Sequence, residues 1–149
     1  MLKNSSTVLC EIFEHISHLH NKLGKKIKIE RPNLLFLVPP YFYFDSIDDP
    51  WYKITVFLAK ESIKFKENNE VYPIICMSKS IFIDSKNIKK ICEDYNGFDG
   101  YIIWISDLNE QKEDIKYLEG IFRLVKTFSI QEKPIIILYG EFLSLLFSK

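Results

Sequence analysis

Four apolar runs in the sequence each end in or beside polar side chains that could carry acid–base chemistry. The runs cover residues 34–38, 72–77, 101–105 and 135–139. Ligands of a parallel α/β sheet bind at the carboxyl ends of its strands, so these side chains are expected along one rim. We take Asp107, Lys79 and Tyr139 as candidate catalytic residues, because a carboxylate, an amine and a phenol can transfer protons. The candidate ligand-binding residues on the same rim are Asp45, Ser78, Ser106, Glu110 and Glu141.

Asp107 differs from the other aspartates in its sequence context. It follows the most apolar run, which is expected at the centre of the sheet, and the next helix is expected only from about Lys112. Helix capping therefore explains Asp107 less well than it explains Asp49, which stands directly before a proline. If Asp107 has a cap or turn role instead, its carboxylate should bond only to the amides of Asn109 and Glu110.

Lys79 is the other residue that local structure explains poorly. A cation beside the start of a helix gains nothing from the helix dipole. The alternative to a functional role is an exposed loop lysine.

Other chemistries find less support in the sequence. His15 and His18 lie one helical turn apart, a spacing that can grip a metal, but no third ligand is apparent, so no metal site is predicted. The five glycines stand apart and form no phosphate-binding loop, and any cofactor stays unknown. The three cysteines have no paired spacing and are expected to be small buried residues. They are Cys10, Cys76 and Cys92.

The elements that would position the rim can also be read from the pattern. The four runs are apolar at every position, which is typical of strands buried on both faces in a parallel sheet. Helices are expected over 6–23, from Asp49 onward, from Asp84 or Ser85 to Gly97, over 112–128 and over 141–147. This order predicts four consecutive β/α units with right-handed crossovers. They would form half of a (β/α)8 barrel or a small open doubly wound sheet. The residues expected to be buried in the second helix are Trp51, Ile54, Phe57, Leu58 and Ile63.

Length and composition indicate one soluble domain. The chain has 149 residues and no formal net charge, so no overall field draws it to nucleic acid or to a membrane surface. Its start lacks the pattern of a signal peptide, and a cytoplasmic location is expected. We expect a single α/β domain over 1–149, with an N-terminal helix and linker at 1–32 and the β/α repeats at 33–149.

Three stretches together resemble a known type of protein. They are residues 38–51, 99–110 and 133–140. They resemble the N-terminal half of longer, uncharacterised prokaryotic proteins of TIM-barrel-like pattern, some distantly similar to the tRNA-guanine transglycosylase type of barrel. The resemblance implies a barrel fold and a chain that is part of a longer barrel. No residue here matches the transglycosylase active site or its zinc ligands, so the resemblance assigns no catalytic residue.

Three functions remain open from the sequence. The first is a barrel-type module of an enzyme, with its site at the carboxyl ends of the strands. The second is a non-catalytic protein-interaction domain that uses the aromatic segment 41–44 and the apolar end of the chain. The third is a nucleotide-sensing doubly wound domain. We expect self-association or a partner chain, through the sheet edges and the apolar C-terminal helix.

Overall fold

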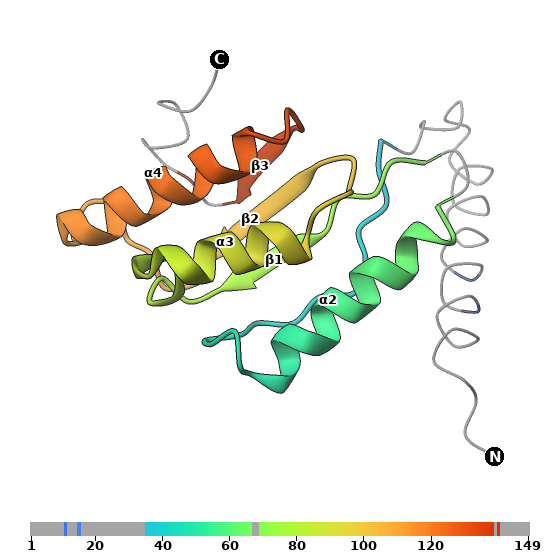
Figure 1. The fold of residues 1–149 in the computed structure, drawn as a ribbon, viewed down its shortest axis with the longest axis horizontal. Helices are drawn as coiled ribbons and strands as arrows, with labels where there is room; N and C mark the ends of the chain where they lie inside the picture. Colours follow the sequence, from blue (N-terminus) through green and yellow to red (C-terminus); the bar gives the residue numbers. More distant parts are fainter. Residues whose placement is uncertain (1–10, 12–14, 16–34, 67–68, 139, 141–149) are drawn as a thin grey trace, which may run out of the picture.

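The computed structural model describes residues 11, 15, 35–66, 69–138 and 140. The chain forms alternating helices and strands (Figure 1), in an α/β arrangement. The elements in order are α2 (Pro50–Ile63), β1 (Ile74–Met77), the 3-10 helix η1 (Ile81–Ile83), α3 (Ser85–Asp94), β2 (Tyr101–Ile105), α4 (Ile115–Ser129) and β3 (Ile135–Leu138). The helix expected over 6–23 lies outside the described residues, except that Glu11 and His15 are helical. The helix expected over 141–147 also lies outside them.

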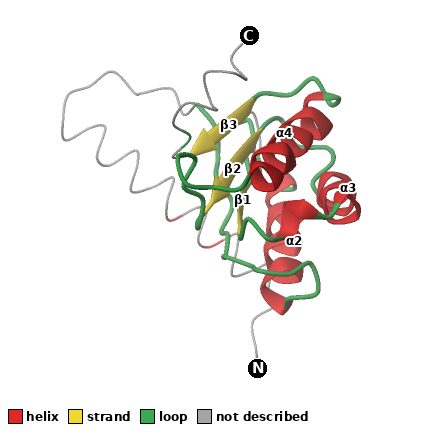
Figure 2. Cartoon of the chain, turned by 90° about the vertical axis from the view of Figure 1, so that its left-hand side faces the viewer, coloured by secondary structure: helices red, strands yellow, loops and turns green. Residues whose placement is uncertain are grey.

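The sheet is parallel, and its strands stand in the order β1-β2-β3. Ile75 pairs with Ile103, which in turn pairs with Ile137, so the centres of the three apolar runs are in register. The predictions of parallel pairing and consecutive order are confirmed for these three strands. The three helices cover one face of the sheet (Figure 2), as right-handed crossovers between strands in consecutive order require.

The prediction of a fourth strand over 34–38, and with it of four complete β/α units, is wrong. The described part of this run makes one isolated parallel bridge, of Leu37 with Val71 just before β1. A second isolated parallel bridge follows further along the chain, of Phe44 with Met77 in β1. Between the bridges stand two prolines, residues 39 and 40, which have no backbone N–H group to donate to a ladder. The backbone N–H of Phe42 donates instead to the Thr55 hydroxyl at 3.2 Å. The segment follows the edge of the sheet without forming a regular strand.

Helix starts follow the capping signals of the sequence. Asp49 accepts a hydrogen bond from the backbone N–H of Trp51, with Pro50 in the first turn. Asp84 caps α3 in the same way, through the N–H of Lys86. The fourth helix begins at Ile115, a few residues later than expected, after Asp114. Capping thus explains the carboxylates of Asp49 and Asp84.

The core lies between the sheet and its helices. Ile75, Met77, Tyr101 and Ile103 point from the strands toward the helices and are buried there. A second, smaller cluster on the opposite face holds Tyr72, Ile74, Cys76 and Ile102. Cys76 is buried as predicted, and burial raises the pKa of its thiol. Cys92 is only half-buried, and Cys10 lies outside the described residues.

The prediction of a buried face of α2 is wrong for three of its five residues, whereas Leu58 and Ile63 are half-buried and Ile63 packs against the core. Trp51, Ile54 and Phe57 are 48, 40 and 47% exposed, and large apolar side chains therefore point to solvent. The residues that α2 buries against the core are mostly small or hydroxyl-bearing. They are Tyr52, Thr55, Ala59 and Ser62. This placement makes the solvent side of α2 an apolar surface.

Candidate functional site

The carboxyl ends of β1 and β2 meet in a hydrogen-bonded group of polar side chains. Ser78 follows β1, and its hydroxyl donates to the Asp107 carboxylate at 3.0 Å. The backbone N–H of Lys79 donates to the other oxygen of the same carboxylate at 2.8 Å. Ser80 joins through its hydroxyl, 3.1 Å from that of Ser78. Three residues of the predicted rim, Ser78, Lys79 and Asp107, are thus brought together as expected.

The Lys79 side chain has a partner that the sequence analysis missed. Its Nζ lies 2.7 Å from Oε1 of Glu113, whose side chain is only 8% exposed, and stands over the ring of Tyr117. The hydrogen bond to Glu113 raises the pKa of Lys79, so the amine stays protonated. A lysine that acts as nucleophile or base needs the opposite shift. Lys79 therefore suits charge recognition better than proton abstraction.

Glu113 carried a weak signal in the sequence. It precedes the fourth helix together with Asp114, and an acidic pair at that place usually indicates capping. In the structure Asp114 takes the N-cap position without a side-chain capping hydrogen bond and pairs with Lys116 instead, while Glu113 turns back to Lys79 and to the N–H of Asn109. The loop between β2 and α4 decides this pairing, since the two charged residues are 34 positions apart.

The other predicted rim residues take different places. Asp45 and Ser106 are exposed, and Glu110 is half-buried. Tyr139 and Glu141 lie outside the described residues. The structure thus joins the polar side chains at the ends of β1 and β2 in one cluster. A contribution from the end of β3 stays a prediction.

Asp107 is neither a helix cap nor a local turn residue, because its carboxylate reaches across to the β1 loop. We expect Asp107→Ala to lower the free energy of unfolding by about 1 kcal/mol, since one hydroxyl and one amide lose their acceptor at a site open to water. Urea denaturation followed by circular dichroism measures the change. The matched control is Asp45→Ala, because Asp45 is an exposed carboxylate that follows the bridge of Phe44 with Met77. Its free energy of unfolding is expected within about 0.5 kcal/mol of wild type. Equal effects of the two substitutions would contradict a stabilising role of the hydrogen bonds that Asp107 accepts from Ser78 and Lys79.

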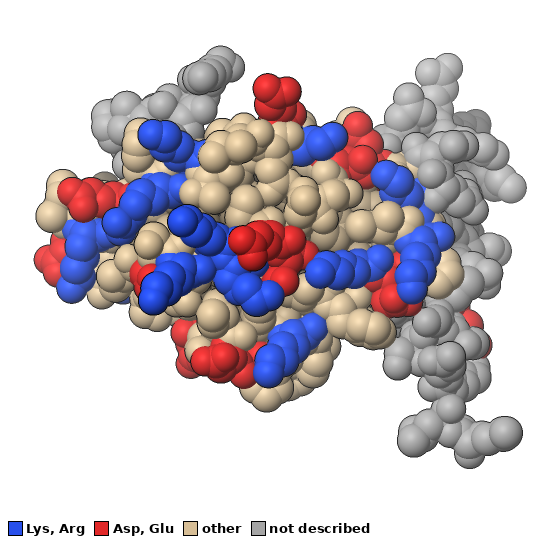
Figure 3. Space-filling view, viewed as in Figure 1, with Lys and Arg blue, Asp and Glu red and all other residues tan. Residues whose placement is uncertain are grey.

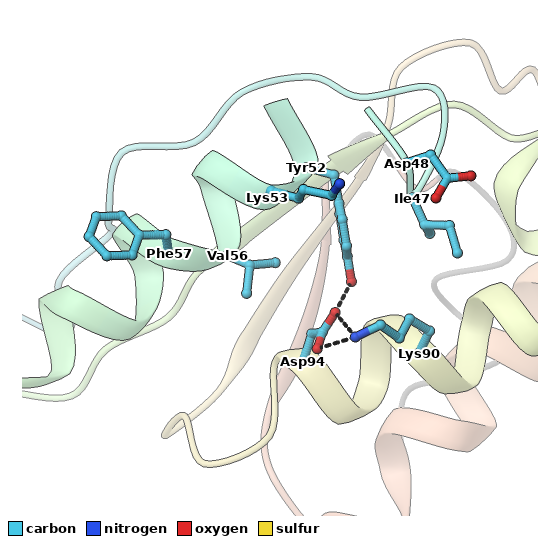
Figure 4. A pocket seen from close by; sticks show the side chains of 8 residues that line it. All are labelled: Ile47, Asp48, Tyr52, Lys53, Val56, Phe57, Lys90 and Asp94. Atoms are coloured by element: carbon cyan, nitrogen blue, oxygen red, sulfur yellow. Dashed lines mark hydrogen bonds and ion pairs between the residues drawn. The ribbon is translucent and has the colours of Figure 1, made fainter. Parts of the chain in front are cut away.

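A second candidate region is a groove between α2 and α3 (Figure 4). Its volume is about 340 Å³, within the range of sites that hold small molecules or inserted side chains. Its lining combines apolar and charged residues: Ile47, Asp48, Tyr52, Lys53, Val56, Phe57, Lys90 and Asp94.

Inside the groove, Asp94 is held by two donors. The Tyr52 hydroxyl donates to Oδ2 at 2.6 Å, and Lys90 Nζ lies 2.7 Å from each carboxylate oxygen. Burial by itself would raise the pKa of the Asp94 carboxyl, but the hydrogen bonds from Lys90 and Tyr52 lower it below its ordinary value. Asp94 therefore stays charged, and each of its oxygens already accepts a hydrogen bond from within the protein.

A third feature is an aromatic surface beside the other flank of α2. Phe42 and Trp51 stack with ring centroids 4.6 Å apart, although both are exposed. Ile54, which is 40% exposed, lies one helical turn from Trp51 on the same side of α2. We call Phe42, Trp51 and Ile54 the aromatic patch. Clustered exposed side chains of this size are typical of contact surfaces, whereas single ones are not.

Comparisons with family models, curated proteins and solved structures find no match to this chain. Within the ranges that the structure describes, no three His, Cys, Asp or Glu side chains lie together as a metal-binding group would require. None of the described helices has the length and apolar character needed to cross a membrane. The polar rim, the groove and the aromatic patch are the candidate features that the described residues offer.

Proposed function

We propose that this protein is a protein-interaction domain that docks a helix of a partner protein along α2. The observation that carries the proposal is the orientation of α2, whose small residues face the core while Trp51, Ile54 and Phe57 face solvent. Exposing large apolar groups costs about 25 cal/mol per Å² relative to burying them. A complex that covers these side chains removes that cost.

A partner helix is the occupant that the architecture favours. The helices α4, α3 and α2 lie side by side on one face of the sheet, with α2 last in the row (Figure 1). A further helix laid against α2 continues this layer and packs by the same interdigitation of side chains. Recognition of an amphipathic helix by an apolar surface is a recurrent mode of protein binding.

The test is a photo-crosslinking amino acid placed at position 54 of the full chain in its own cells. We expect one discrete crosslinked protein, identified by mass spectrometry, and none from the same group at position 122. Phe122 is the control because it is an exposed aromatic residue, 56% accessible, on α4. The identified protein is then purified and titrated against wild type and against Trp51→Ser/Ile54→Ser. The double variant should weaken binding at least about tenfold, because central aromatic contacts dominate interface energies.

Other outcomes would change the assignment. A crosslink only to a second copy of this chain would make the surface a self-association interface. A crosslink to its own N-terminal residues would make it an internal contact. Absence of any crosslink at 54, or equal crosslinking at 122, contradicts the proposal.

The polar cluster at the strand ends favours a second candidate function. We propose, as the alternative, a barrel-type enzyme module in which Asp107, Lys79 and Ser78 contact a ligand. The consecutive strand order with helices on one face is the arrangement found in each half of a (β/α)8 barrel. A thermal-shift screen of small anionic metabolites tests it, since Lys79 is a protonated cation at the rim. A ligand that raises the Tm of wild type should leave Asp107→Asn and Lys79→Met unchanged, and equal shifts would exclude this site.

A further inference from the structure

The turn between α3 and β2 (Figure 1) places an asparagine directly before a glycine at the surface of the protein. Helix α3 ends at Asp94, and Tyr95 takes its C-cap position, so Asn96 and Gly97 follow outside the helix. Both are exposed. Gly97 has a φ of 97°, the left-handed conformation that commonly follows a helix end. Asparagine is one of the chemically labile residues, and its side-chain amide can form a five-membered ring with the backbone nitrogen of the next residue.

Neither reacting group of this dipeptide is held by the rest of the described structure. The backbone N–H of Asn96 donates to the carbonyl of Glu93 at 3.2 Å, which fixes the main chain at the helix end. No hydrogen bond to the Asn96 carboxamide, and none from the N–H of Gly97, is found among the residues that the structure describes. A Cβ atom built at Gly97 would meet no other heavy atom within 4 Å, so the space around the turn is open. Glycine also lacks the side chain that would hinder an approach of its nitrogen to Cγ of Asn96.

We propose that Asn96 is a site of self-modification, which converts to aspartate and isoaspartate through a cyclic imide with Gly97. The amide nitrogen of Gly97 loses its proton and forms a bond to Cγ of Asn96, while the bond from Cγ to Nδ2 breaks. The leaving nitrogen takes up a proton from water and departs as ammonia. Water then opens the imide, giving aspartate when it attacks Cγ and isoaspartate when it attacks the backbone carbonyl carbon. No atom is oxidised or reduced, and water is the only co-reactant.

The conversion acts on the end of α3. Both products carry a carboxylate just beyond the C-cap, where the helix dipole is negative and where Glu93 and Asp94 already lie. Isoaspartate also lengthens the backbone by one methylene group shortly before Phe98, which is buried in the core. Figure 3 shows acidic and basic side chains interspersed over the face that carries α3, so the added charge acts at the helix end and not by completing a charged patch. We therefore expect the converted protein to unfold at a lower temperature.

The experiment incubates the purified full chain at physiological temperature, at neutral and at mildly alkaline pH. Peptide mass spectrometry follows the replacement of the carboxamide by a carboxyl group, backbone fragmentation separates aspartate from isoaspartate, and released ammonia is measured in parallel. Conversion should be faster at the higher pH, because the attacking group is the deprotonated amide nitrogen. The matched site is Asn109, which is also exposed but is followed by Glu110. Asn96 should convert at least about tenfold faster than Asn109, since the side chain of Glu110 hinders the attack.

Two variants separate the steps. Asn96→Gln keeps a carboxamide but would need a six-membered ring, so residue 96 should stay unchanged and the Tm should be the same before and after incubation. Freshly purified Asn96→Asp carries the new charge on a normal backbone. Its Tm should lie below that of wild type, and the isoaspartate fraction of aged wild type should unfold at a still lower temperature.

Four results would overturn the inference. The first is no conversion at Asn96 in the native protein, even if the urea-unfolded chain converts, because the folded turn would then protect the site. The second is conversion at Asn109 as fast as at Asn96, and the third is a rate at Asn96 that does not rise with pH. The fourth is a Tm of the converted protein equal to that of equally aged Asn96→Gln, which would exclude an effect on α3.

Discussion

Gly120→Val is expected to lower the free energy of unfolding by about 2–4 kcal/mol, because the new side chain overlaps Phe82. A Cβ atom at position 120 would stand 2.5 Å from Cδ2 of Phe82 and 3.0 Å from its backbone oxygen. Phe82 is fully buried in η1, so neither its ring nor its backbone has room to withdraw. The contact explains a glycine in the interior of α4, where helix propensity disfavours it by about 1 kcal/mol.

Thermal and urea unfolding followed by circular dichroism measure this effect, and the Tm is expected to fall by about 5–15 °C. The control is Glu119→Val, which introduces the same β-branched residue at the exposed neighbouring position and should cost at most about 1 kcal/mol. In a double-mutant cycle, Phe82→Leu should offset part of the Gly120→Val loss, since the two side chains compete for one space. A Gly120→Val protein as stable as Glu119→Val would show that α4 and η1 do not pack as described.

Tyr95→Phe is expected to stabilise the fold by about 1–2 kcal/mol, which is an uncommon sign for a core substitution. The Tyr95 side chain is fully buried, and its hydroxyl has no hydrogen-bond partner in the described structure. Burial raises the pKa of this phenol above its ordinary value, as expected for a hydroxyl surrounded by apolar groups. Phenylalanine keeps the ring and its contact with Phe98 and removes only the buried polar atom.

Tyr52→Phe is the matched change with the opposite expected sign. Its hydroxyl donates to the charged Asp94, so its removal should cost about 1–2 kcal/mol. Both variants delete one oxygen from a buried tyrosine. Comparing their free energies of unfolding by chemical denaturation therefore distinguishes the effect of the hydrogen-bond partner from the effect of the ring. If the two variants shift stability in the same direction, the assignment of the two hydroxyls is wrong.

Local sequence patterns determined the strands and the helix starts. The run at 101–105 forms a strand with those bounds, because an uninterrupted apolar run is stable only where both faces of a sheet are covered. The carboxylates at positions 49 and 84 cap helices, since a side chain that bonds the first free N–H groups acts within a few residues of chain. These features depend on neighbours in the sequence and need no knowledge of the whole fold.

The prediction of a strand over 34–38 is wrong for a reason that also lies in neighbouring residues of the sequence. Pro39 and Pro40 were visible in the sequence, and the missing N–H groups could have predicted an irregular edge. The apolar run before the prolines favours a strand, but the two residues that follow it cannot donate to a ladder. From residue 35 onward the segment pairs through isolated bridges, of Leu37 with Val71 and of Phe44 with Met77.

Only the tertiary structure decided which face of α2 is buried and which partner Lys79 takes. The apolar residues of α2 occur on several sides of the helix, so periodicity could not select one face. The space beneath α2 is already filled by large rings such as Phe44, which packs on Tyr52 at 4.9 Å between centroids. Beside Tyr52, α2 therefore turns its small residues, such as Ala59, inward, while Trp51, Ile54 and Phe57 stay outside. In the same way, Lys79 meets Glu113 because the loop after β2 folds back over the end of β1, a contact between residues far apart in sequence that no local pattern records.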